Sequence, residues 1–163
     1  MSTGMLPGAL RLTTPTEREI VLTRAFDAPR HLVFQALTRP ELLKRWPGVW
    51  GGWSMAVCEV DLRVDGTYRY VWRGPGGASM GIRGIYREIA PPERLVHAEQ
   101  FDGWPEGESL VTTVLVEHDG KTTLTSTVLY PSREVRDEAL STGMESGVAR
   151  SYDALAVLLA LIA

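Results

Sequence analysis

The chain has 163 residues, a length that suits one domain with a core of its own. Hydrophobic residues make up 44% of the chain and the net charge is -3, which is typical of a soluble globular protein. The same charge excludes a nucleic-acid binder, because phosphate binding needs clustered Lys and Arg. A single cysteine, Cys58, excludes an internal disulfide and a zinc site built on cysteines.

Targeting and membrane signals are weak along the whole chain. The N-terminus has no basic segment that leads into an apolar stretch, as a secretory signal would. The most apolar run, residues 154–163, is about half as long as the roughly 20 residues that a membrane-spanning helix needs. We therefore expect a cytoplasmic protein without membrane insertion.

The N-terminal third predicts a tail, a strand and two short helices. Residues 1–16 contain scattered Gly and Pro without a period, so we expect a flexible tail followed by one domain over residues 17–163. Residues 19–26 alternate as a strand. A proline-initiated helix follows over residues 30–37, and a second short helix extends from Thr38 to Trp46.

From Ser54 onward the pattern changes to period two, which indicates antiparallel strands joined by hairpins. Asp119-Gly120 is a strong signal for a tight hairpin turn. With the first strand, this segment completes a sheet of seven strands. The six predicted strands of this segment are residues 56–62, 67–73, 79–89, 94–101, 110–117 and 122–130.

The C-terminal residues 132–162 predict a long amphipathic helix, which Thr142-Gly143 can divide into two pieces. Gly143, Gly147 and Ser151 give the middle of its apolar face little side-chain volume. A helix with such a thin middle, laid over a curved sheet, predicts a cavity. The apolar stripe consists of Leu140, Met144, Val148, Ser151, Leu155, Leu158 and Ile162.

Several local segments, in this order along the chain, match a known family. The chain resembles the SRPBCC or START-like superfamily, in particular the branch named after the activator of a heat-shock chaperone ATPase. The resemblance implies an α+β helix-grip fold, in which a curved seven-stranded antiparallel sheet wraps a long C-terminal helix around a mostly apolar cavity. The matching segments are residues 24–29, 38–43, 84–89, 92–96, 130–132 and 142–145.

The aromatic residues Tyr68, Tyr70 and Trp72 share one face of a predicted strand. We expect them to face the helix and to line a ligand cavity together with residues of the apolar stripe. The alternative is that the same rings fill the space that the glycines leave. Many relatives carry a tryptophan near Val148, and its absence here would enlarge the cavity. The helix residues expected in the lining are Met144, Val148 and Ser151.

His97 and Glu99 share one face of the next-but-one strand, about 7 Å apart along it. If that face is the inner one, the pair can transfer protons or bind a polar group of a ligand. If it is the outer one, they are a solvated pair. The opposite face carries Val96 and Ala98, so alternation alone does not decide, and these are the only two catalytic candidates.

Three tryptophans, Trp46, Trp50 and Trp53, cluster in a glycine-containing segment after the second short helix. They suit the rim of a pocket, and the alternative is a loop that its tryptophans pin onto the sheet. The histidines are isolated from one another, so we expect no metal site, and no motif for a cofactor is present.

These patterns favour a protein that binds a small apolar or amphipathic molecule between the sheet and the C-terminal helix. A polyketide-cyclase-like enzyme is the first alternative, and it requires an ionisable group that faces the cavity. An interaction module that activates a chaperone ATPase is the second. Ligand identity and oligomeric state, including a homodimer, stay open at this point.

Overall fold

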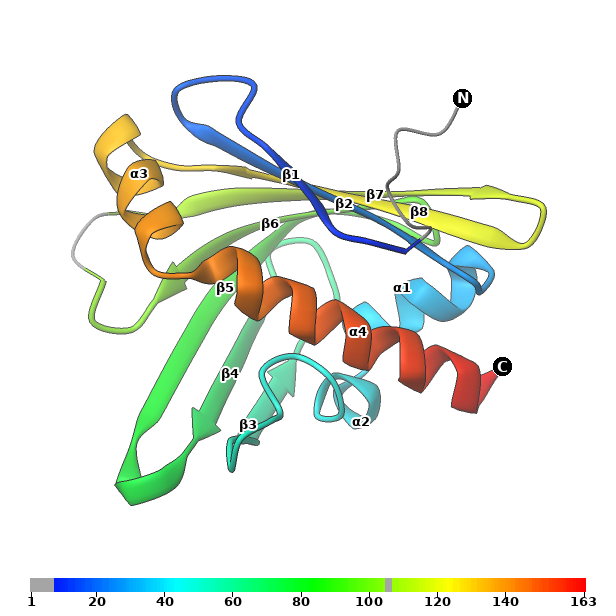
Figure 1. The fold of residues 1–163 in the computed structure, drawn as a ribbon, viewed down its shortest axis with the longest axis horizontal. Coiled ribbons are helices and arrows are strands. Elements are labelled where there is room, and N and C mark those ends of the chain that lie inside the picture. Colours follow the sequence, from blue (N-terminus) through cyan, green and yellow to red (C-terminus); the bar gives the residue numbers. More distant parts are fainter. Residues whose placement is uncertain (1–7, 105–106) are drawn as a thin grey trace.

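The computed structural model of the chain describes residues 8–104 and 107–163. It is an α+β fold with one antiparallel sheet of eight strands in the order β1-β2-β8-β7-β6-β5-β4-β3 (Figure 1). The first four strands along the chain are β1 Arg11–Thr13, β2 Glu19–Phe26, β3 Ser54–Val60 and β4 Thr67–Arg73. The others are β5 Ser79–Ala90, β6 Arg94–Phe101, β7 Ser109–His118 and β8 Lys121–Leu129.

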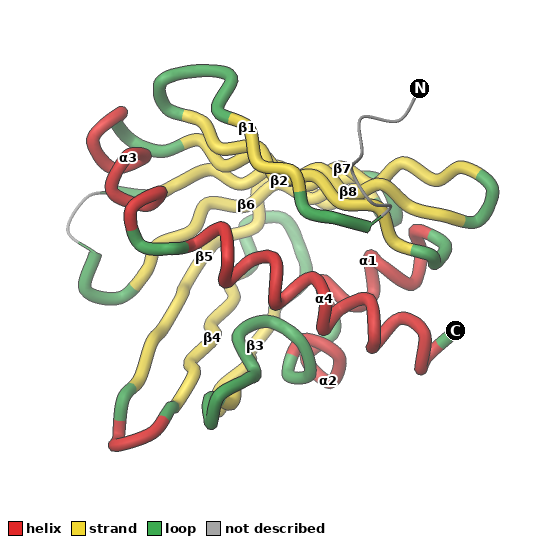
Figure 2. Tube along the Cα trace, viewed as in Figure 1, coloured by secondary structure: helices red, strands yellow, loops and turns green. Residues whose placement is uncertain are grey.

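Four α-helices accompany the sheet: α1 Arg30–Thr38, α2 Pro40–Leu43, α3 Arg133–Ser141 and α4 Met144–Ile162. A 3-10 turn over Pro75–Gly77 joins β4 to β5. The sheet curves around α4, and α1 and α2 lie beside the C-terminal half of that helix (Figures 1 and 2). No helix in the described residues is long and apolar enough to span a membrane.

The sheet has one strand more than the seven that we expected. The additional strand is β1, within the segment that we assigned to a flexible tail, and it pairs with β2 from Arg11 opposite Thr23 to Thr13 opposite Val21. A strand of three residues is too short to show a period in the sequence. β1 is a strand only because it pairs with β2, and the local sequence does not reveal that pairing.

The C-terminal helix is divided at Gly143, which has a φ of 81°. That left-handed conformation suits glycine, and it lets the chain change direction between α3 and α4. Ser132 caps α3, because its hydroxyl accepts a hydrogen bond from the amide of Val135 at 3.1 Å. The break at Gly143 confirms the predicted division of the C-terminal helix into two pieces at Thr142-Gly143.

The side chains that α3 and α4 bury differ from the apolar stripe that we predicted for one long helix. Leu155 and Leu158 are buried as the stripe predicts, whereas Leu140, Met144, Val148, Ser151 and Ile162 are half-buried. Because the chain changes direction at Gly143, α3 and α4 present different faces to the sheet. A single helical period that runs through both segments therefore does not predict which residues are buried. The residues that the helices bury are Val135 and Ala139 on α3, and Tyr152, Leu155, Leu158 and Leu159 on α4.

The core consists of two clusters. The larger cluster joins the C-terminal half of α4 and the helices α1 and α2 to the inner face of the sheet, with Tyr152 between Phe26 and Trp46. The smaller cluster packs α3 against β2 and includes Ile20 and Tyr130. The N-terminal half of α4, with Val148, contacts both clusters from their margins.

Candidate functional site

The aromatic face of β4 is turned inward, as the alternation predicts. Trp72 is opposite Met55 of β3, and Tyr68 is opposite Gly84 of β5. A Cβ at Gly84 would overlap the Tyr68 ring, so this glycine lets the ring lie against the backbone of β5. Tyr68 is 3% exposed, whereas Tyr70 is half-buried.

Three polar side chains meet on the inner face where β4 and β6 approach β5. The Tyr68 hydroxyl lies 2.6 Å from Nδ1 of His97. It also lies 3.3 Å from Oε2 of Glu99. His97 and Glu99 therefore both face inward, which settles the alternative that alternation left open. Both side chains are half-buried, so solvent still reaches them from the inner side of the sheet.

Burial controls the protonation of this trio. It raises the pKa of the Glu99 carboxyl to about 7, an effect that the hydrogen bond with Tyr68 partly offsets. It also lowers the pKa of His97 to about 4. Burial and the nearby Glu99 carboxyl raise the pKa of the Tyr68 phenol. At neutral pH the histidine is uncharged and the carboxyl exchanges its proton readily, which is the behaviour of a general acid or base.

Tyr86 of β5 completes the aromatic wall. Its ring centroid lies 5.2 Å from that of Tyr68. The Tyr86 hydroxyl is buried and has no hydrogen-bond partner among the described residues. Burial raises the pKa of this phenol to about 12, and the nearby Tyr70 hydroxyl partly offsets that rise. An unpartnered buried hydroxyl costs free energy, and a ligand or a water molecule that reached it would recover part of that cost.

The helix residues expected in the lining stay partly accessible. Met144, Val148 and Ser151 of α4 are half-buried. A Cβ added at Gly147, beside them, would meet no atom within 4 Å. The thin middle of the helix therefore leaves open space beside it. Ser151 also serves the structure, because its hydroxyl accepts a hydrogen bond from the Gly48 amide at 3.1 Å.

The three tryptophans occupy different environments. Trp46 is 6% exposed and lies in the core, where its indole donates to the Ala36 carbonyl at 2.9 Å. Trp50 and Trp53 are half-buried. The Arg150 guanidinium lies 5.5 Å from the centroid of the Trp50 ring. Of the three, Trp50 and Trp53 have the partial accessibility that a pocket rim needs.

The loop that carries these tryptophans is held from the sheet and from the helix. Trp72 donates to the Pro47 carbonyl at 2.7 Å, and Gly48 is bound to Ser151 of α4. A Cβ at Gly74 would overlap the Trp53 ring, so that ring lies directly on the backbone after β4. The contacts of this segment therefore fit both alternatives, a pocket rim and a loop that its tryptophans fix to the sheet.

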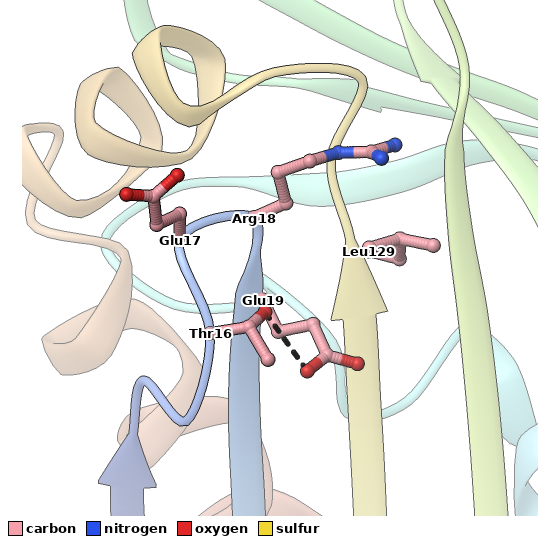
Figure 3. A pocket seen from close by; sticks show the side chains of 5 residues that line it. All are labelled: Thr16, Glu17, Arg18, Glu19 and Leu129. Carbon is pink, nitrogen blue, oxygen red and sulfur yellow. Dashed lines mark hydrogen bonds between the residues drawn. The ribbon is translucent and has the colours of Figure 1, made fainter.

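The described surface also has hollows that α4 does not line. The first, of about 440 Å³, is lined by Thr16, Glu17, Arg18, Glu19 and Leu129 (Figure 3). It is open to solvent, and its polar groups are occupied: Thr16 donates to Glu19 at 3.0 Å and Arg18 donates to the Tyr130 carbonyl at 2.9 Å. The second, of about 350 Å³, is lined by Tyr68 and Gly84 together with Arg69, Arg83 and Glu108.

Neither hollow is lined by His97, Glu99 or a residue of α4, so we take the inner-face trio as the candidate site. Among the described residues, no three His, Cys, Asp or Glu side chains gather as ligands of a metal ion. Cys58 is half-buried in β3 opposite Tyr70, and burial raises the pKa of its thiol. A thiol in that state is a poor nucleophile.

Comparison with known proteins identifies the family. The family model described as "Activator of Hsp90 ATPase homolog 1-like protein" matches residues 27–160. The chain belongs to this family. A protein of known crystal structure from Rhodobacter sphaeroides is 33% identical, with a TM-score of 0.88 over 94% of this chain and 99% of that one. No curated protein matches the sequence.

More distant solved structures have the same fold. A protein from Nitrosomonas europaea is 25% identical with a TM-score of 0.78, over 92% of this chain and 100% of that one. An AHSA1-like protein from Aeromonas hydrophila is 18% identical with a TM-score of 0.64, over 81% of this chain and 88% of that one. The START-like helix-grip architecture implied by the sequence resemblance is thereby confirmed, with eight strands in place of seven.

Sequence reasoning missed three residues that shape this family member's inner face. Tyr86 stands in a strand whose alternation is interrupted, because a bulge lies between Tyr86 and Glu88. Gly84 supports Tyr68, and two strands must be aligned before that role is visible. Tyr152 lies one position after Ser151, outside the expected apolar stripe. The large size of its side chain was the one feature of the sequence that suggested a buried position.

Proposed function

We propose that this protein binds a small apolar or amphipathic molecule between α4 and the inner face of the sheet. The observation that carries the proposal is the trio of Tyr68, His97 and Glu99, which places two half-buried ionisable side chains and a buried phenol on a mostly apolar face. A half-buried carboxyl without a basic partner costs stability. Groups with strongly shifted pKa values cluster at binding and catalytic sites, so the trio suits the polar end of a ligand.

Apolar contacts would supply most of the affinity. Burial of apolar area contributes about 25 cal/mol per Å² before the costs of association are subtracted. The space beside Gly147 and the half-buried Met144, Val148 and Tyr70 support an apolar body of the ligand at this place. Trp50 and Trp53 would form the rim on the loop side.

Native mass spectrometry of the gently purified protein, followed by solvent extraction, tests whether a ligand is carried. Binding in vitro is measured by the fluorescence of N-phenyl-1-naphthylamine, an uncharged apolar probe. Val148→Trp narrows the proposed space and is expected to abolish the probe signal. Val157→Trp is the matched control, because Val157 is on the same helix and 64% exposed. Equal binding by both variants would contradict the proposal.

An enzyme of the polyketide-cyclase type is the second candidate. It requires an ionisable group that faces the proposed site, and both His97 and Glu99 meet that requirement. A carboxyl with a pKa of about 7 can take a proton from a carbon next to a carbonyl and return it to an oxygen. Ring closure of a model poly-β-keto thioester that is lost in Glu99→Gln would support this function.

The name of the family suggests a third candidate, stimulation of a chaperone ATPase. It is tested by adding the protein to the chaperone and measuring ATP turnover. Unchanged turnover would remove it.

A further inference from the structure

We infer that the polar end of the bound molecule is a basic amine, a class that the charges on the inner face select. The inference rests on the proposed function and adds the chemistry of the ligand to it. On the inner face of β4, β5 and β6 within the described residues, Glu99 is the only side chain that carries a formal charge. The other residues on that face are Tyr68, Tyr70, Trp72, Met80, Ile82, Gly84, Tyr86, Ile89, Leu95, His97 and Phe101.

Arg24 of β2 and Arg150 of α4 have other partners. Arg24 of β2 pairs with Asp153 of α4 at 2.7 Å. Arg150 of α4 lies over the Trp50 ring. His97 is uncharged near neutral pH, because burial lowers its pKa to about 4. An anionic ligand would therefore keep Glu99 protonated or be repelled by its carboxylate, which disfavours fatty acids and phosphates as the pH rises through 7.

The number of hydrogen-bond donors that Glu99 lacks favours an amine over a neutral ligand such as an alcohol. The Tyr68 hydroxyl has one proton and two acceptors, Nδ1 of His97 at 2.6 Å and Oε2 of Glu99 at 3.3 Å. The hydroxyl can donate to only one of them at a time, so an ionised Glu99 has at most one donor, at the longer distance of 3.3 Å. An ammonium group brings a full positive charge and three N–H donors, whereas an alcohol brings one donor and no charge.

The aromatic wall also favours a cation. Tyr68 and Tyr70 have ring centroids 4.9 Å apart, and Tyr70 keeps part of its surface accessible. A desolvated ammonium near such rings gains cation–π attraction in addition to its pairing with the carboxylate. The same site offers an alkyl chain the apolar surface beside Val148.

Amine binding should release a proton. Without ligand, the Glu99 carboxyl has a pKa of about 7 and is mostly protonated at pH values near 6. The titratable groups around it are Tyr68 and Tyr70 of β4, Tyr86 of β5, His97 of β6 and Tyr130 after β8, and none of them is charged there. The ammonium keeps its own proton and lowers the pKa of Glu99, so the carboxyl proton leaves to solvent.

The test compares dodecylamine, dodecanol and dodecanoate, which share one chain length, as competitors of N-phenyl-1-naphthylamine below their micelle concentrations. We expect the amine to bind about tenfold or more tightly than the alcohol, and the carboxylate to bind most weakly. Calorimetry near pH 6 in two buffers of different ionisation enthalpy should show release of close to one proton per bound amine. Glu99→Gln should lose both the preference and the release.

Glu59→Gln is the matched control, because Glu59 is exposed on β3, and it should keep both properties. Denaturation curves confirm that both variants fold. A carboxylate that binds as tightly as the amine, an amine no tighter than the alcohol, or proton uptake on binding would overturn the inference. Absence of probe binding to the wild-type protein would instead overturn the proposed function, so the two failures are distinguishable.

Discussion

Replacement of Glu99 by Gln should make the protein more stable, and the gain should depend on pH. The folded protein holds the proton of Glu99 up to a pKa of about 7, whereas the unfolded chain releases it near the ordinary value of 4.5. Between these values the folded state binds the extra proton. Wild-type stability due to this group is therefore fully present below pH 4.5 and is lost as the pH rises through 7.

The size of the effect follows from the same two pKa values. Each unit between them is worth about 1.4 kcal/mol, so ionisation of Glu99 costs the folded state about 3 kcal/mol by pH 8. Glutamine has nearly the same shape, cannot ionise and can still accept a hydrogen bond from Tyr68. The variant should thus match the wild type near pH 4.5 and exceed it by about 3 kcal/mol at pH 8.

Urea denaturation of both proteins at several pH values from 4.5 to 8, followed by tryptophan fluorescence, measures this difference. The contributions of all other titratable groups cancel in the comparison. A difference that is constant with pH, or one that shrinks as the pH rises, would refute the burial of Glu99 on which the site depends.

Three further predictions concern the same region. Replacement of His97 by Gln should abolish the loss of stability that this histidine causes in the wild type as the pH falls from 6.5 to about 4, because only the unfolded state takes up the proton there; urea curves of both proteins at pH 4.5 and 7 measure this. Gly147→Ala should stabilise α4 by about 0.5–1 kcal/mol, because alanine favours the helical conformation more than glycine does. Gly143→Ala should cost roughly 1–2 kcal/mol, because Gly143 has a φ of 81°. Equal shifts of the thermal unfolding midpoint in the two variants would contradict this prediction. Gly84→Ala should cost about 1–3 kcal/mol, because its Cβ meets the Tyr68 ring, and Tyr68→Ala in the same background should recover part of that loss.

Local patterns predicted most of the sheet and the helices. The alternation over residues 67–73 and 94–101 gave β4 and β6 with the bounds that the structure has. Period-two segments bounded by Gly and Pro turns are informative because one face of each strand is buried. The break at Gly143 was predictable for the same local reason, since glycine tolerates a left-handed backbone.

The site was less predictable, because it depends on register between strands. Alternation placed His97 and Glu99 on one face, but the inner and outer faces of β6 are both partly apolar. Only the alignment of β4, β5 and β6 brings the Tyr68 hydroxyl to both of them. The support of Tyr68 by Gly84 and the position of Tyr152 depend on contacts between distant segments, which no local period encodes.

The most direct test of the central proposal is to locate a bound amphiphile by NMR. Nuclear Overhauser effects between bound dodecylamine and the isotope-labelled protein would identify the contacting side chains. The account predicts contacts of the alkyl chain with Val148 and Met144, and contacts of the carbon next to nitrogen with the Tyr70 ring and Glu99. Contacts confined to the hollow around Arg18 and Leu129, or to the outer face of the sheet, would contradict it.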